Sequence, residues 1–217
     1  MGGLGGRENN RSGPIPSRRV AIQDHERERL IPDTSIFTNP DIYRQFGESP
    51  AEAFRHFLEM AAEARGLVVY MPSSIYEELK KMVRDLHIPA RARAIFKVKS
   101  PRKYELQIPA FLLYEFIEDL RKRINKGLRV AEEAVRLGSA KKPGEVINTL
   151  RRKYREALRE GILDSREDLE LILLALELDG IILSADRGVL LMADKLGIRY
   201  VPPAEIRETL EGFRYMA

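Results

Sequence analysis

Short apolar runs alternate with longer amphipathic segments along most of the chain. Four runs, each four residues long and mostly apolar, are typical of buried strands: residues 29–32, 67–70, 181–184 and 198–201. Between them, apolar positions recur at the three- and four-residue spacing of a helix. Mostly apolar strands that are separated by helices pair in parallel and are covered on both faces. The pattern therefore predicts an α/β fold with a short parallel sheet.

Helices are predicted over residues 49–66, 73–83, 164–179 and 189–196. Ser73 or Ser74 is expected to cap the second of these helices, and Gly180 is expected to end the third. The first helix has Pro50 in its first turn and one apolar face, made by Ala53, Phe54, Phe57, Leu58 and Ala61. These faces would cover the sheet.

Residues 109–159 follow a different pattern, because no strand is expected there. They predict two helices, over 109–137 and 145–159, joined by a turn over residues 139–144. The apolar stripe of the first helix is Phe116 or Ile117, Leu120, Ile124, Leu128, Ala131 and Val135; the second has Val146, Ile147, Leu150, Tyr154 and Leu158.

No strand interrupts these two helices, so they predict an antiparallel helical hairpin. We expect it to be inserted into an α/β domain made by residues 28–108 and 160–217. A two-helix hairpin has little core of its own. Its apolar stripe therefore needs another surface, either the main domain or a second copy of the hairpin, and we expect homo-oligomers.

Composition narrows the classes of function. The chain has 217 residues, a net charge of +4, no cysteine and three scattered histidines, which excludes disulfides, thiolate catalysis and Cys-ligated zinc. No apolar run approaches the roughly 20 residues needed to span a membrane, and no secretion signal is found, so we expect a cytoplasmic protein. Residues 1–27, rich in Gly, Pro, Arg and Asn, are expected to form a flexible N-terminal arm.

Four aspartates carry most of the chemical information. Asp33 and Asp186 each follow an apolar strand, and Asp164 and Asp168 lie four residues apart at the start of an apolar helix. Strand carboxyl ends and helix N-termini of an α/β sheet converge on one crevice. Gathered acids repel each other unless a cation neutralises them, and Mg²⁺ or Mn²⁺ prefers oxygen ligands. Such ions activate water and stabilise charge on a phosphodiester, which indicates a metal-dependent nuclease.

Helix capping is the alternative interpretation of these acids. Asp164 could be an N-cap, with Glu167 at the third helical position of a capping box and Asp168 as a first-turn acid. Asp33 and Asp186 could each be caps as well. All four being only caps, in this order and these contexts, is the less favoured interpretation.

Neighbouring polar residues add to the acidic pattern. Thr34, Ser35 and Ser184 are suited to hydrogen-bond the carboxylates. Glu77 or Glu78 could reach the acids, although a glutamate on a helix surface is the default expectation.

Basic residues concentrate in and beside the predicted hairpin. They include Lys141, Lys142, Arg151, Arg152, Lys153 and Arg155. Each cluster taken alone is compatible with a solvated helix face. Their separation from the acids favours an RNA-binding arm apart from the cutting site, because structured RNA is recognised largely through its phosphates and shape.

Three segments resemble PIN-type nucleases, and more closely the RNA-free ribonuclease P family known as HARP, formerly labelled an RNA ligase partner protein. These segments are Asp33–Pro40, Met71–Leu79 and Ser184–Gly188, and the resemblance extends over residues 28–210. It implies a PIN-like α/β/α domain and Mg²⁺- or Mn²⁺-dependent removal of the 5′ leader of precursor tRNA, leaving a 5′-phosphate. One departure is Pro32, which removes a backbone donor just before the first acid.

The same resemblance implies catalytic and metal-binding roles for Asp33, Asp164, Asp168 and Asp186. It also implies that the hairpin builds dimers and larger assemblies, in which one subunit measures the tRNA while another cuts. The alternatives are a PIN endonuclease acting on other structured RNA, and a non-catalytic RNA-binding partner of an RNA-processing enzyme. A nucleotide-binding domain is less favoured, because no Gly-rich phosphate loop follows the first strand.

Overall fold

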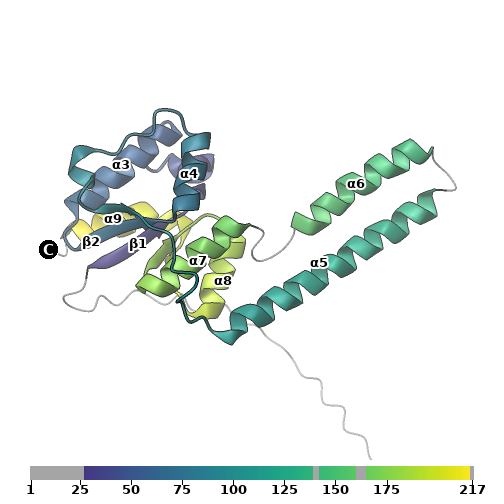
Figure 1. Ribbon diagram of the computed structural model, residues 1–217. Coiled ribbons are helices and arrows are strands. Elements are labelled where there is room, and N and C mark those ends of the chain that lie inside the picture. Colours follow the sequence, from purple (N-terminus) through teal and green to yellow (C-terminus); the bar gives the residue numbers. More distant parts are fainter. Residues whose placement is uncertain (1–26, 139–141, 160–164, 216–217) are drawn as a thin grey trace, which may run out of the picture.

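A single parallel sheet of five strands forms the centre of the molecule (Figure 1). The computed structural model describes residues 27–138, 142–159 and 165–215. The sheet order is β3-β2-β1-β4-β5, with β1 (Glu28–Pro32), β2 (Leu67–Met71), β3 (Phe96–Val98), β4 (Ile181–Leu183) and β5 (Tyr200–Val201). The predicted α/β fold and its four strands are confirmed. The N-terminal arm predicted over residues 1–27 lies outside the described residues, except Arg27.

Helices connect the strands and cover the sheet. They are α1 (Ser35–Thr38), α2 (Pro40–Tyr43), α3 (Pro50–Glu63), α4 (Ser73–Met82), α5 (Ala110–Leu137), α6 (Pro143–Arg159), α7 (Arg166–Leu178), α8 (Arg187–Leu196) and α9 (Ile206–Tyr215), with short 3₁₀ turns η1 (Ala90–Ala92) and η2 (Pro203–Glu205). Helix α3 contacts β2 and α9, whereas α7 contacts β1, β4, α4 and α8. Figure 1 shows α3 and α7 on opposite sides of the sheet.

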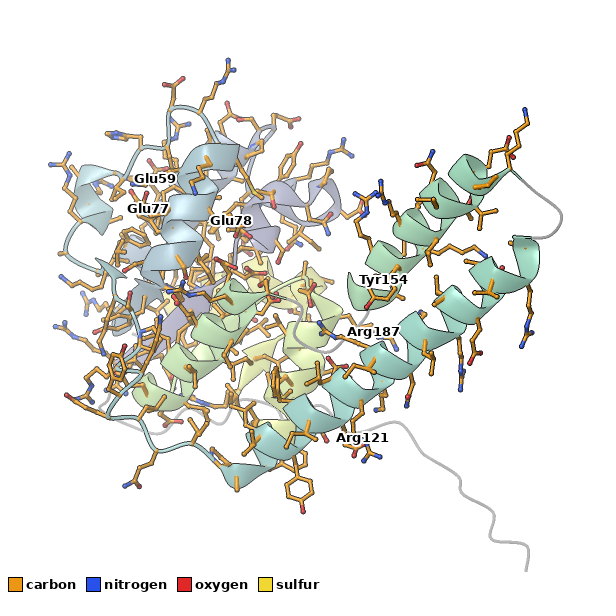
Figure 2. All side chains as sticks on the ribbon, turned by 45° about the vertical axis from the view of Figure 1, so that its right-hand side comes forward. Glu59, Glu77, Glu78, Arg121, Tyr154 and Arg187 are labelled. Atoms are coloured by element: carbon orange, nitrogen blue, oxygen red, sulfur yellow. The ribbon has the colours of Figure 1, made fainter. Side chains whose placement is uncertain are left out.

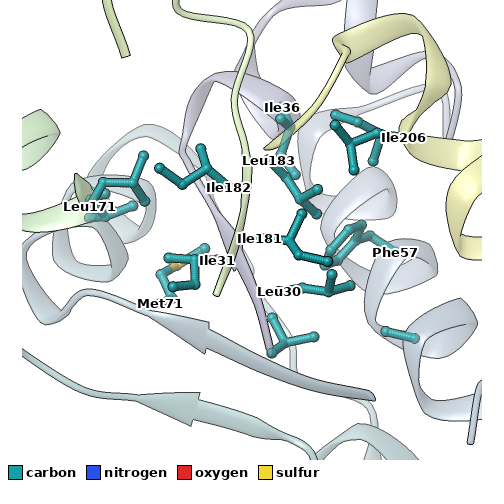
Figure 3. Packing of buried hydrophobic residues seen from close by; sticks show 14 of the residues in the cluster. Leu30, Ile31, Ile36, Phe57, Met71, Leu171, Ile181, Ile182, Leu183 and Ile206 are labelled. Carbon is teal, nitrogen blue, oxygen red and sulfur yellow. The ribbon is translucent and has the colours of Figure 1, made fainter. Parts of the chain in front are cut away.

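The core lies on both faces of the central strands (Figure 3). Ile31 and Ile182 are register partners and point towards α7, whereas Leu30 and Ile181 are register partners on the opposite face, next to Phe57. Each of these five side chains is at most 1% exposed. Side chains alternate along a strand, so a run that is apolar at every position buries both faces.

Two residues shape the pairing of β1 with β4. Pro32 is paired with Leu183, and the next residue donates its N–H to the Leu183 carbonyl at 2.9 Å, so the pairing continues past the proline. A Cβ at Gly180 would lie 2.5 Å from Cδ1 of Ile31, closer than real contacts allow. Glycine directly before β4 therefore permits the close approach of the two strands.

The caps of two helices differ from the predictions, and α6 and α8 each begin two residues earlier than predicted. The caps predicted for α4 are wrong: Pro72 is the N-cap, and Ser73 and Ser74 are the first helical residues. The N-cap of α7 is Ser165, one residue after the position that the sequence favoured. The α3 prediction is confirmed, with Ser49 as N-cap and the whole predicted apolar face fully buried.

The antiparallel helices α5 and α6 extend away from the sheet (Figure 1). Helix α5 has 28 residues and is therefore about 42 Å long. An ion pair between Lys195 of α8 and Glu115 of α5 holds the base of the hairpin. None of the described helices is long and apolar enough to cross a membrane.

The contact between the two helices of the hairpin includes small buried residues as well as Val130, Val146 and Leu150. Gly127, Ala134 and Ala157 are buried. A Cβ at Gly127 would lie 2.7 Å from the Tyr154 ring, which shows how closely the ring lies against α5.

The apolar stripe of α5 lies on the open surface instead: Phe116 is 61% exposed, Ile124 58%, Leu128 58% and Val135 79%. The predicted stripe therefore exists, but neither α6 nor the sheet domain covers it.

Candidate active site

Asp33 lies at the carboxyl end of β1 and is only 7% exposed. Its Oδ1 accepts the N–H of Thr34 at 2.7 Å. Its Oδ2 accepts the hydroxyls of Ser35 at 2.5 Å and Ser184 at 2.8 Å. As predicted, these three polar residues hydrogen-bond the carboxylate. They fix its orientation at the edge of the sheet.

Ser184 connects the ends of the two central strands. Its side chain is fully buried, and its hydroxyl, which donates to Asp33, also accepts the N–H of Asp186 at 3.0 Å. The N–H of Ala185 donates to the Ser35 hydroxyl at 2.9 Å. The loops after β1 and β4 are thus joined by side-chain hydrogen bonds, which holds Asp33 and Asp186 at one edge of the sheet.

Asp186 is the N-cap of α8. Its Oδ1 accepts the N–H groups of Gly188 at 2.7 Å and Val189 at 3.0 Å. The capping interpretation is therefore correct for this residue. Both bonds use Oδ1, so capping is compatible with a ligand at Oδ2.

Asp168 takes part in a capping box at the start of α7. Its N–H donates to the Ser165 hydroxyl at 3.0 Å, and its Oδ2 accepts the Ser165 N–H at 3.1 Å. The predicted capping box exists, but Ser165 and Asp168 form it, in place of Asp164 and Glu167. The prediction for Asp164 falls outside the described residues.

Glu78 is close enough to Asp33 for the two charges to interact. From the sequence, the default expectation was a glutamate on the helix surface. Burial raises the pKa of the Glu78 carboxyl, and the charges of Asp33 and Glu167 raise it further, against smaller opposing effects of Lys81 and a Thr34 hydrogen bond. Glu77 is exposed and pairs with Lys80 at 2.5 Å, and Figure 2 shows the two glutamates on different sides of α4. The signal in the sequence was the position of α4 directly after β2, but only packing decides which glutamate faces inward.

We refer to Asp33, Glu78, Asp168 and Asp186 as the acidic site: Ser184 links Asp33 to Asp186, and the charge of Asp33 acts on Glu78. Asp168 is assigned to it from its place at the start of α7, next to Glu167, whose charge also acts on Glu78. The side-chain atoms in the acidic site that could bind a metal are all carboxylate oxygens. The charges of Asp33 and Glu167 act against ionisation of Glu78. A hard divalent cation suits such donors and relieves their repulsion. Among the described residues, no three acidic or histidine side chains lie close enough together to hold a metal ion jointly.

The basic residues predicted to bind RNA lie on α6 or at its start. Arg152 pairs with Glu156 at 3.0 Å and Lys153 pairs with Glu133 at 2.5 Å, whereas Arg151 and Lys142 are exposed. The side chain of Arg155 bonds the Arg151 carbonyl at 3.1 Å. Lys141 falls outside the described residues.

Comparison with known proteins gives one consistent family. The PINc domain ribonuclease family matches residues 29–215. An RNA-free ribonuclease P of Pyrococcus furiosus is 50% identical over 186 residues, which cover 84% of this chain and 92% of the relative. Those of Thermococcus kodakarensis and Thermodesulfovibrio yellowstonii are 50% identical over 188 residues and 44% over 185, covering 85% of this chain and 94% of each relative.

Proposed function

The chain belongs to the PINc domain ribonucleases and, among them, to the RNA-free ribonuclease P family, and on that premise we propose that it removes the 5′ leader of precursor tRNA. It is an endoribonuclease, and hydrolysis leaves a 5′-phosphate on the mature tRNA. The observation that carries this proposal is the pairing of Asp33 with Asp186 through Ser184 at the carboxyl edge of the sheet. Ligands of open α/β sheets bind at that edge.

The proposed ligands of Mg²⁺ or Mn²⁺ are Asp33, Asp164, Asp168 and Asp186, and Glu78 is a further candidate. Asp164 lies outside the described residues, and the described carboxylates alone do not form a group of three at metal-binding spacing. When bound, the ion supplies a water of lowered pKa and neutralises charge on the phosphoryl oxygens. The chain's own residues prepare this site. Ser35 and Ser184 orient Asp33, and the caps of α7 and α8 orient Asp168 and Asp186.

The hairpin is proposed to bind the folded body of the tRNA through the basic residues of α6. Arg151 and Lys142 are exposed and suited to phosphate contacts. The exposed stripe of α5 supports homo-oligomerisation through the same hairpin, because large contiguous apolar patches mark interaction surfaces. In such an assembly, one copy would bind the tRNA while another copy cuts it.

Incubation of the full chain with 5′-labelled precursor tRNA tests the proposed function. We expect one cut, at the mature 5′ end, in Mg²⁺ and none in EDTA. Asp186→Asn keeps an N-cap of similar strength and should stay folded while losing cleavage. Cuts at many positions would favour an endonuclease acting on other structured RNA, and binding without any cut would favour the non-catalytic RNA-binding partner.

A further inference from the structure

Glu170 is a buried carboxylate outside the acidic site. It lies on α7, two residues after Asp168, and its side chain is only 4% exposed. Residues two apart on a helix point to different sides. Glu170 therefore faces away from Asp168 and has another task. Buried carboxylates are rare unless they are paired and hydrogen-bonded, so its partners define that task.

Three segments supply those partners. Ser74, in the first turn of α4, donates its hydroxyl to Oε2 at 2.5 Å. Lys103, in the segment that joins β3 to α5, forms an ion pair with Oε1. Arg166, the first residue of α7, donates to Oε1 at 3.2 Å. Both carboxylate oxygens are thus engaged, and two cations offset the buried charge.

The bond from Ser74 crosses from α4 to α7 beside the acidic site. Ser74 and Glu78 are four residues apart and share one face of α4. The charge of Glu167, which lies on α7, acts on Glu78 of α4. Repulsion between these acids separates α4 from α7, whereas the bond from Ser74 to Glu170 holds the two helices together.

We propose that Glu170 is a positioning residue, which fixes through Ser74 the spacing between Glu78 on α4 and Asp168 on α7. This inference rests on the proposed function of the acidic site. Polar residues that orient metal-binding carboxylates typically change metal affinity or activity by roughly 10- to 100-fold when they are replaced.

Glu177 provides a matched control on the same helix. Its side chain is 3% exposed, and it pairs with Lys99 and with Arg102, whose Nε lies 3.1 Å away. Both cations belong to the segment that also carries Lys103. Glu177 thus matches Glu170 in burial, charge and partner segment, but its partners are Lys99 and Arg102, and neither of them lies on α4. It also lies nearly two helical turns farther from Asp168.

The experiment compares full-length Glu170→Gln and Glu177→Gln. Thermal unfolding, precursor-tRNA affinity, single-turnover cleavage and Mn²⁺ binding to the protein alone are measured for each. Both variants should lose similar stability. Only Glu170→Gln should cleave roughly 10- to 100-fold more slowly at saturating enzyme and bind Mn²⁺ more weakly, with tRNA affinity unchanged.

Two variants of Ser74 test the bond between the helices independently. Ser74→Ala should slow cleavage and weaken Mn²⁺ binding in the same direction, and Ser74→Thr, which keeps the hydroxyl, should restore both. If Glu170→Gln does not fold, the Ser74 pair decides alone. Equal losses for Glu170→Gln and Glu177→Gln, or wild-type Mn²⁺ binding and cleavage rate in Ser74→Ala, would overturn the proposal. A wild-type chain that leaves precursor tRNA uncut defeats the proposed function, while Mn²⁺ binding still tests the positioning.

Discussion

The sheet domain and the helical hairpin differ in how far their apolar residues are buried. In the sheet domain, residues such as Ile31, Phe57 and Ile182 are fully buried by elements of the same chain. In the hairpin, Ile124 and Leu128 are each 58% exposed, although they occupy the apolar face of a long amphipathic helix. The sheet domain is complete in one copy of the chain. The hairpin has an apolar surface that no other part of the described chain covers.

The largest expected effect is a difference in the free energy of unfolding between a variant in the sheet domain and one in the hairpin. Phe57→Ala should lower the free energy of unfolding by about 3–5 kcal/mol, because it leaves a cavity in a fully packed core. Leu128→Ala, on the exposed stripe, should change it by less than about 0.5 kcal/mol in the isolated chain. Denaturant unfolding at low protein concentration measures both. Similar losses for the two variants would mean that the stripe is already covered within one chain.

The next effect is a loss of cleavage without a loss of precursor-tRNA binding. Asp186→Asn should slow single-turnover cleavage by roughly 10²–10³-fold, a typical cost of losing one preorganised group that stabilises charge. Precursor-tRNA affinity should stay unchanged, because binding is proposed for the hairpin. Asp41→Asn, an exposed first-turn acid of α2, is the control and should cleave normally. A parallel loss of affinity in Asp186→Asn would contradict the division between binding arm and cutting site.

A third change addresses the exposed stripe. Ile124→Glu combined with Leu128→Glu should reduce the mass of the particle in light scattering, because charges cannot be buried unpaired in an apolar interface. Met82→Glu, at an exposed apolar position on α4, should leave the mass unchanged. A wild-type chain that is already monomeric would remove the stripe as an assembly surface.

The smallest effect is a dependence of stability on pH in the sheet domain. Burial acts to raise the pKa of Glu177, but hydrogen bonds from Lys99 and Arg102 outweigh it and hold the pKa below its ordinary value. Its ionised form therefore stabilises the fold above the ordinary glutamate pKa, and this contribution is lost as the pH falls below that value. Melting temperatures of the wild type should fall more steeply below about pH 4.5 than those of Glu177→Gln.

The sheet was predictable where a strand is buried on both faces. Residues 29–32 and 181–184 are nearly continuous in apolar character because each lies between two layers of helices. The edge strand β3 was missed, because only Phe96 is buried there while Lys97 and Val98 are exposed. Helix α9 has a clear apolar face but was not predicted.

Within the site, Asp33 and Asp186 could be identified because each directly follows a predicted strand. Which side chains on the helices face the site depends on how each helix is rotated about its axis. The choice between Glu77 and Glu78 depends on how α4 rotates against α7, which one sequence does not specify. The same limit applies to the hairpin. On α6, the predicted positions Val146, Leu150 and Tyr154 do face α5. On α5, the contact uses Gly127 and Ala134, small residues with a weak hydropathy signal, so the stripe of larger residues dominated the prediction.

The hydroxyl bridge at Ser184 joins two parts of the chain that are synthesised at very different times. Ser184 and Asp186 are made some 150 residues after Asp33, with the whole hairpin in between. A ribosome that has completed α6 has produced the hairpin that we propose binds RNA, but only the first of the two strand ends that carry Asp33 and Asp186. Parallel pairing of β1 with β4 must then close this long loop, which is a slow step. Nascent chains therefore carry their basic arm well before they acquire the ability to break RNA.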